Sequence, residues 1–296
     1  MGDCIISLSA IKYLKELGNF SEIHFGVAPR HASLFKKSLS SDVMTFGADY
    51  RSFKGIISFF KKISEINPDY IIEFSPVRRT GKVIHSHKVL TRAKYQYFSS
   101  KIDTISWPDD LTSTSCLNSD LNDIWCAFGA DHDLPSVAQY LPPTLESSVL
   151  NSRPFIAMSM ASSSEDHMPS VKHFLELVDS VANRFPDKEI VIPTSNSALD
   201  QKIKTQLMQS KHELNFIESG LEELPDLFNQ CCFFVGMDTG IKHLAAYLGL
   251  PTFSYIPEKS YPYSHPYLSP HKAVLLHSDP LYVKSAFWDW LDLIEQ

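Results

Sequence analysis

Short apolar runs that are typical of buried strands alternate along this chain with longer segments whose apolar residues recur at helical spacing. The predicted strands are 23–27, 70–74, 155–160, 190–192, 214–217, a run from 231 to 236 and a last one after Pro251. The predicted helices are 4–17, 31–39, 53–66, 170–184, 199–209, 221–229, a helix that ends at Gly249, and 283–294. Strands that alternate with helices indicate βαβ units with parallel sheets.

The segment 140–154 is the clearest linker, because it places three prolines among small polar residues. A chain of 296 residues is long enough for two domains of about 150 residues each. We therefore expect an N-terminal domain over 1–145 and a C-terminal domain over 153–280. The remaining segment, 281–296, is expected to form a helix with an aromatic stripe that packs back towards the N-terminal domain.

The start of the chain departs from the usual order of a doubly wound domain, in which a strand precedes the first glycine-containing turn. Gly2 and Asp3 stand where that turn is expected, and the helix 4–17 follows at once. The first N-terminal strand is therefore predicted to be missing. Either the true start lies upstream of Met1, or the domain forms without this strand.

Charge and composition exclude several classes of protein. A formal charge of -7 argues against a general nucleic-acid binder. The five cysteines form no CxxC pair, which favours a reducing, cytoplasmic compartment over a disulfide framework. No apolar stretch approaches the roughly 18 residues of a membrane span, and the first residues lack the pattern of a signal peptide.

The segment 231–256 is the most informative one. Its first strand ends at Gly236, a turn through Asp238, Thr239 and Gly240 follows, and His243 lies on the first turns of the next helix. A strand, a small-residue turn and a helix N-terminus form an anion site, because free N–H groups and the helix dipole point at one spot. The alternative is that Asp238 only caps the helix and that His243 is a packed histidine.

The same residues, FVGMDTGIKHLAAYLGLPTFSYI, resemble the C-terminal signature of glycosyltransferase family 9, the lipopolysaccharide heptosyltransferases. That signature is Gly-x-Asp-Ser/Thr-Gly, then x-x-His-Leu-Ala-Ala and Leu-Gly-x-Pro-Thr. The start, GDCIISLSAIKYLKEL, resembles the family's N-terminal Gly-Asp and its following helix. A third stretch, PDYIIEFSPVRRTG, resembles the Asp-x-Val-Ile-Asp segment of its N-terminal domain.

The resemblance implies an α/β fold of the GT-B type, with two Rossmann-like doubly wound domains facing a cleft. It implies a nucleotide-sugar donor such as ADP-heptose on the C-terminal domain and an acceptor on the N-terminal one. It further implies inversion at the anomeric carbon without a metal or other cofactor. Asp3 matches the carboxylate proposed as the general base, which would take the proton of the acceptor hydroxyl. From the residues alone, Asp3 could equally cap the first helix.

Asp238, Thr239 and Gly240 match the family's contacts to the diphosphate and the sugar. The turn's N–H groups would stabilise the charge that develops on the leaving diphosphate. Asp238 itself is expected to accept hydrogen bonds from sugar hydroxyls, because it would repel phosphate. His243 would contact phosphate or brace the turn.

The loop after strand 155–160 is a second donor candidate through Ser162 and Ser163. The family carries a lysine here, but its position holds Asp166, and Lys172 is the nearest substitute. A solvated loop that caps the next helix is the alternative. Asp200 matches a carboxylate that binds the ribose, with capping as its alternative.

A basic cluster after strand 70–74 includes Arg78, Arg79 and Lys82. These residues are predicted to bind an anionic glycolipid or glycan acceptor. The cluster could also hold the protein on an anionic membrane surface, or form a solvated face.

Together these features predict an inverting, cytoplasmic glycosyltransferase that moves a sugar from a nucleotide-sugar donor onto a bacterial surface glycolipid or glycan. A peripheral position on the cytoplasmic face of the inner membrane is an option. Two alternatives remain open. One is a catalytically impaired relative that binds nucleotides or glycans, and the other is a nucleotide-sugar epimerase. The residues do not specify the donor sugar, its base, the acceptor or the oligomeric state.

Overall fold

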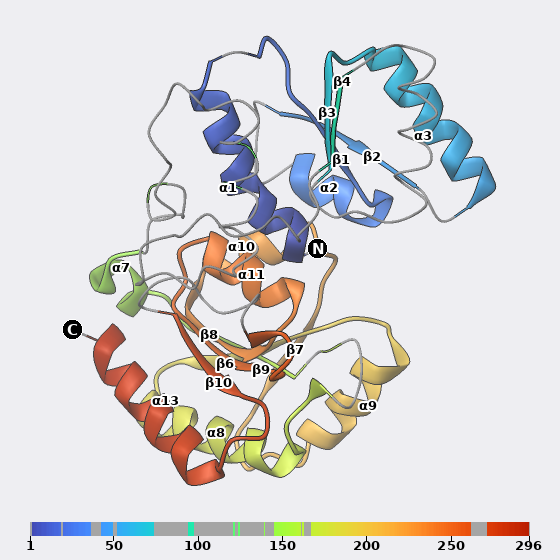
Figure 1. Cartoon of the computed structure of the whole chain (residues 1–296). Coiled ribbons are helices and arrows are strands. Elements are labelled where there is room, and N and C mark those ends of the chain that lie inside the picture. The colour runs from blue at the N-terminus through green and yellow to red at the C-terminus, as the bar shows by residue number, and fades with distance from the viewer. Residues whose placement is uncertain are drawn as a thin grey trace. The chain divides into compact units, whose positions relative to one another are not determined.

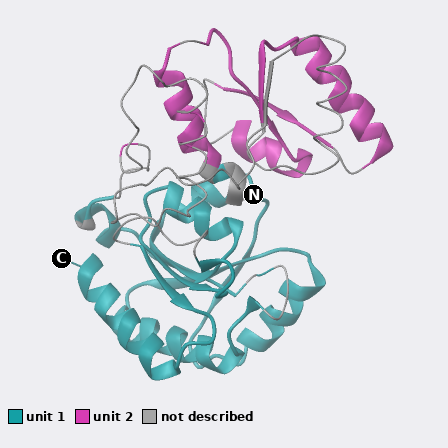
Figure 2. Ribbon diagram, viewed as in Figure 1, with its two compact units in different colours: residues 1–5, 114–116, 141–296 teal, residues 6–113, 117–140 magenta. Residues whose placement is uncertain are grey.

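The computed structural model describes residues 2–18, 20–36, 43–49, 52–73, 94–97, 121, 124, 139, 145–160, 162, 167–261 and 271–295. The chain forms two compact units (Figure 2). One comprises residues 1–5, 114–116 and 141–296, and the other comprises 6–113 and 117–140.

The larger unit is built on a six-stranded parallel sheet of order β10-β9-β8-β5-β6-β7 (Figure 1). Its strands are β5 (Phe155–Ser159), β6 (Glu189–Thr194), β7 (Asn215–Glu218), β8 (Cys231–Met237), β9 (Thr252–Ile256) and β10 (Lys272–Leu275). The chain adds β6 and β7 on one side of β5 and then returns to add β8, β9 and β10 on the other. The strand order therefore reverses between β5 and β8.

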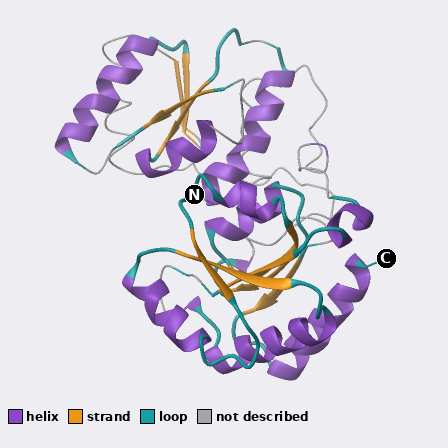
Figure 3. Cartoon of the chain, turned by 180° about the vertical axis from the view of Figure 1, so that it is seen from behind, coloured by secondary structure: helices purple, strands orange, loops and turns teal. Residues whose placement is uncertain are grey.

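Helices cover both faces of this sheet, as Figure 3 shows from behind. They are α7 (Ser147–Asn151), α8 (Val171–Arg184), α9 (Ala198–Leu207), α10 (Leu224–Phe228), α11 (Gly240–Tyr247) and α13 (Pro280–Ile294). Alternate residues of the strands divide between the two faces. Phe233 and Val235 pack in one core with α8, α9 and α13, whereas Phe234 stacks edge-on against Phe228 of α10.

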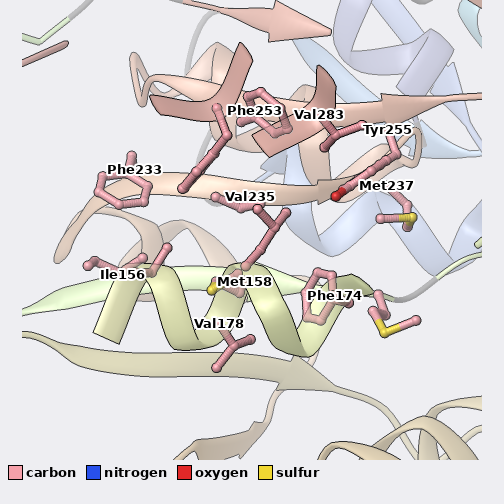
Figure 4. Packing of buried hydrophobic residues seen from close by; sticks show 14 of the residues in the cluster. Ile156, Met158, Phe174, Val178, Phe233, Val235, Met237, Phe253, Tyr255 and Val283 are labelled. Atoms are coloured by element: carbon pink, nitrogen blue, oxygen red, sulfur yellow. The ribbon is translucent and has the colours of Figure 1, made fainter. Parts of the chain in front are cut away.

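The larger core lies on the face of α8, α9 and α13 (Figure 4). Phe253 of β9 is fully buried there, and its ring centroid lies 5.1 Å from that of Phe287 and 5.6 Å from that of Trp290, both on α13. The aromatic stripe of this last helix contacts the C-terminal sheet, because β8 and β9 present a continuous apolar surface to it. That the helix packs back towards the N-terminal domain stays a prediction.

The smaller unit has two parallel pairs of strands rather than one sheet among its described residues. β1 (His24–Val27) pairs with β2 (Met44–Gly47), and β3 (Tyr70–Glu73) pairs with β4 (Lys94–Tyr97). Its helical elements are α1 (Gly2–Glu16), which also reaches into the larger unit, η1 (Pro29–His31), α2 (Ala32–Leu34) and α3 (Phe53–Ile66). α1 precedes every described strand, and no described strand joins the two pairs.

α3 shows how the sequence sets a helix in this unit. Ser52 caps it by accepting a hydrogen bond from the N–H of Gly55, and Asn67 ends it in the left-handed conformation with φ of 47°. Phe59 and Ile63, one turn apart, are buried against Ala48 and Ile71. The apolar stripe of α3 therefore contacts residues next to β2 and within β3.

Substitution of Phe287 by alanine is predicted to destabilise the larger unit by about 3–5 kcal/mol, because a fully buried ring would leave a cavity beside Phe253 and Trp290. Urea unfolding followed by circular dichroism would measure this loss. The matched control is Leu281→Ala on the same helix, where a side chain that is 78% exposed should change stability by less than about 0.5 kcal/mol. Equal effects of the two substitutions would contradict the packing of α13.

Candidate functional site

The carboxyl ends of β5 and β8 lie side by side at the point where the strand order reverses. In open α/β sheets, ligands bind outside this edge, because the loops on either side of the reversal diverge and leave a crevice. Ser162 follows β5 and is half-buried, and the turn at Asp238 follows β8. The fold thus brings two of the sequence-predicted segments to one edge of the sheet.

Gly236 allows β8 to lie close to β5 just before the turn. A Cβ atom at this position would lie 2.8 Å from the carbonyl oxygen of Ser159 and 2.5 Å from Cζ of Phe234. Both distances are shorter than ordinary contacts, and the first is to rigid backbone. The first glycine of the motif is therefore required by close packing of the strands.

The turn after β8 is fixed by the sheet and leads directly into α11. The N–H of Asp238 donates to the carbonyl of Tyr255 on β9 at 2.9 Å, which extends the strand pairing by one residue. Thr239 then takes the N-cap position with extended backbone and makes no side-chain capping hydrogen bond. By contrast, Ser170, Ser197 and Asp279 cap α8, α9 and α13 with their side chains.

The helix cap bears on one of the two interpretations of Asp238, that it caps α11. The cap position belongs to Thr239, so Asp238 does not cap α11. The N-terminal N–H groups of an α-helix have no partner within the helix, and here no side chain of the N-cap covers them. The start of α11 therefore offers an anion the positive end of a helix dipole at the edge where ligands bind.

The carboxylate of Asp238 pairs instead with Lys242, which sequence reasoning missed. The Lys242 Nζ lies 2.7 Å from Asp238 Oδ1, and the two side chains are 3% and 10% exposed. The Nε2 atom of His243 lies 3.8 Å from the same oxygen, which is too far for a hydrogen bond. The spacing of four residues between an acid and a lysine is the sequence signal that could have found this pair.

Two histidines near this pair are held neutral. Burial, and next the positive charge of Lys242, lower the pKa of His243 well below its usual value. The same two causes lower the pKa of His271 to about 4, and its Nδ1 lies 3.0 Å from the hydroxyl of Thr252. At neutral pH His243 can therefore contact a phosphate only as a neutral hydrogen-bonding group, and Lys242 supplies the positive charge.

Asp200 lies on the first turn of α9, after β6, and braces the loop between them. Its Oδ2 accepts hydrogen bonds from the N–H of Ser195 at 2.9 Å and from the hydroxyl of the same serine. Its own N–H donates to Ser197, so Ser197 is the cap of α9 and Asp200 is not. A contact of Asp200 with a ribose stays a prediction.

Several predicted residues lie wholly or partly outside the described residues. Ser163 and Asp166 do, and so do Arg78, Arg79 and Lys82 of the basic cluster. The backbone of Asp3 is described, and its side chain is not. Because α1 begins at Gly2, Asp3 lies within the first turn of the helix and not at a cap before it. Lys172, the substitute considered for the missing lysine, is exposed on α8.

The described residues contain no group of three or more side chains that could hold a metal ion. Within the same residues, no helix is long and apolar enough to cross a membrane.

A family model, described as glycosyltransferase family 9 (heptosyltransferase), matches residues 117–277, which is more than half of the chain. No curated protein matches the sequence. Among solved structures, E. coli heptosyltransferase WaaC with ADP-2-deoxy-2-fluoro heptose is similar, with a TM-score of 0.71 at 14% identity over 98% of this chain and 96% of that one. E. coli ADP-heptose lps heptosyltransferase II gives a TM-score of 0.69 at 15% identity over 99% and 96%.

A different enzyme class has a weaker likeness. The UDP-GlcNAc 2-epimerase of Neisseria meningitidis bound to UDP-GlcNAc gives a TM-score of 0.55 at 14% identity, over 99% of this chain and 90% of that one. At such identities a likeness concerns the fold alone. The expected α/β fold with parallel sheets, of the GT-B heptosyltransferase type, is thereby confirmed.

Replacement of Gly236 by alanine should cost about 1–3 kcal/mol of stability, because the added methyl group meets the Ser159 carbonyl and forces β8 away from β5. Urea unfolding measures the loss. Gly220→Ala serves as the control, since its nearest neighbour is the flexible carboxylate of Glu222 at 3.1 Å. If both variants are equally stable, the close approach of the strands is not a constraint.

The lowered pKa of His271 predicts a loss of stability in acid. Its pKa is about 4 in the folded chain and about 6.5 in the unfolded one, so the unfolded state binds more protons between these values. Stability contributed by the neutral imidazole is present above pH 6.5 and is lost as the pH falls towards 4. Between pH 7.5 and 5.0 the wild type should lose on the order of 2 kcal/mol more than His271→Gln, measured by urea unfolding. Identical pH profiles would show that His271 is not held neutral.

Proposed function

Because the chain belongs to glycosyltransferase family 9, the heptosyltransferases, we propose that it transfers a sugar with inversion from a nucleotide-sugar donor to a bacterial surface glycolipid or glycan. The observation that carries this proposal is the turn at Asp238. It lies where the strand order reverses, and it leads into a helix whose N-cap residue, Thr239, makes no side-chain capping hydrogen bond. The family supplies the reaction type, and this turn supplies a place for the donor.

The donor's diphosphate would lie at the start of α11. N–H groups from Thr239 onward point outward from this end of a helix, and they would stabilise negative charge as the bond between the sugar and the diphosphate breaks. WaaC of E. coli is similar in fold and has been solved with ADP and with an ADP-heptose analogue. We therefore propose ADP-heptose as the first donor to test.

Asp238 would orient the sugar. One of its oxygens, Oδ1, is occupied by Lys242, and the described residues give Oδ2 no partner. A carboxylate oxygen in this state can accept hydrogen bonds from sugar hydroxyls. Ser162 and Ser163 would approach the donor from the loop after β5, and Asp200 would approach the ribose from α9.

Asp3 is the proposed general base. In the transfer, the acceptor oxygen attacks the anomeric carbon from the side opposite the diphosphate, the sugar–phosphate bond breaks, and the hydroxyl proton passes to the Asp3 carboxylate. The leaving group departs as the free nucleoside diphosphate. The resemblance implies that this step needs no metal or other cofactor.

The acceptor side is proposed from the basic cluster of Arg78, Arg79 and Lys82. Guanidinium groups bind carboxylates and phosphates in two-pronged geometry, which suits an anionic glycolipid or glycan such as a lipopolysaccharide inner core. The same charges would attract an anionic leaflet, so we propose a cytoplasmic protein that can contact the inner membrane peripherally.

A second candidate function is a relative that binds nucleotides or glycans without transferring a sugar. The sequence of the donor loop favours it, because Asp166 stands where the family carries a lysine that would neutralise the diphosphate, and Glu165 makes the loop more acidic still. A nucleotide-sugar epimerase is a third and weaker candidate. Such an enzyme would convert the donor with no acceptor present.

Asp3→Ala is predicted to lower sugar transfer about 100-fold or more while nucleotide binding is kept, because only the proton acceptor is lost. Asp238→Ala is predicted to abolish transfer as well. Release of ADP from ADP-heptose in the presence of lipopolysaccharide core acceptors measures both. Asp289→Asn removes an exposed carboxylate of α13 and serves as the control.

The outcomes separate the candidates. Full transfer activity in Asp3→Ala or Asp238→Ala would contradict the proposed mechanism. A wild type that binds ADP-heptose but transfers nothing to any acceptor would favour the second candidate. Turnover of the donor without acceptor, with a changed sugar, would favour the epimerase.

A further inference from the structure

Lys242 falls on one of the two variable positions between the Asp-Thr-Gly and the His-Leu-Ala-Ala of the family signature. Its side chain is nevertheless 3% exposed and pairs with the signature's aspartate at 2.7 Å. We infer that Lys242 is a positioning residue of the donor site, which neutralises Asp238 so that a nucleoside diphosphate can bind beside it. This inference rests on the proposed function and adds a residue to it.

A carboxylate next to a diphosphate site poses a problem of charge. An unpaired Asp238 beside the start of α11 would repel the bound phosphates, and a partly buried site screens this repulsion poorly. The sequence of the loop after β5 offers no positive charge to offset this repulsion, since the loop carries Glu165 and Asp166. A cation close to Asp238 would relieve this repulsion.

Lys242 is the one lysine or arginine that the described residues place in the loops after β5, β6 and β8 or in the first turn of α11. Lys172 lies on the exposed surface of α8. His243 does not take this role, because burial and the charge of Lys242 lower its pKa and leave it neutral. The positive charge beside Asp238 is therefore that of Lys242.

The buried Asp238–Lys242 pair is not well explained by its contribution to the stability of the fold. Burying two charges costs desolvation that their attraction often fails to repay, and apolar replacements of buried ion pairs are frequently as stable. A buried pair placed at the edge of the sheet where ligands bind is better explained by the ligand. Lys242 holds Asp238 through Oδ1, which leaves Oδ2 for the sugar.

The test measures ADP binding to the full chain by calorimetry. Lys242→Met should weaken ADP binding about tenfold or more, because Asp238 then keeps its charge beside the diphosphate. The double variant Asp238→Asn/Lys242→Met removes both charges and should bind ADP within about threefold of the wild type. It should still fail to transfer sugar from ADP-heptose, since the carboxylate is gone. Lys284→Met, an equal charge loss on the exposed face of α13, should bind ADP normally.

The binding measurements can overturn the inference about Lys242 in two ways. Wild-type affinity in Lys242→Met overturns the inference, and so does a double variant as weak as the single one, which would mean that Lys242 contacts phosphate directly. If Lys242→Met does not fold, the double variant, which removes both charges of the Asp238–Lys242 pair, decides alone by the same threefold criterion. A wild type that binds neither ADP nor ADP-heptose refutes the proposed donor, and the inference falls with it.

Discussion

The close parallel pairing of β5 with β8 is the contact on which the larger unit depends. It joins the two halves of the sheet, and it requires a residue without a side chain at Gly236, where β8 approaches the Ser159 carbonyl. The same pairing defines the point where the strand order reverses. Because the loops diverge only there, the packing of two strands determines where a ligand can bind.

Sequence pattern predicted the elements of the larger unit well because most are long or fully buried. The predicted helix 170–184 corresponds to Val171–Arg184, and the predicted strand 155–160 to Phe155–Ser159. The predicted strand 190–192 was cut short at Pro193, whereas β6 continues to Thr194. Pairing with β5 ends at Val191, so a proline beyond it removes no hydrogen bond of the ladder on that side. Strands β2, β4 and β10 were missed.

The turn after β8 was predictable in position, but the charge beside it was not. The spacing of Gly236, Asp238 and Gly240 identified the turn, because these residue types suit a close strand, a turn and a helix start. The four-residue spacing of Asp238 and Lys242 allows an ion pair but does not predict that it is buried, since a lysine on a helix is usually solvated. Its burial depends on the surrounding fold, which no local pattern encodes.

The two faces of the sheet in the larger unit pack against different helices. The face of α8, α9 and α13 holds the large aromatic core, whereas α11, with Lys242, lies across the backbone of β8 and β9. Substitutions separated by a sheet and sharing no partner tend to act independently. Drift in the aromatic core can therefore alter how long the protein survives in a cell without altering the turn that leads into α11, and that turn can diverge on an unchanged scaffold.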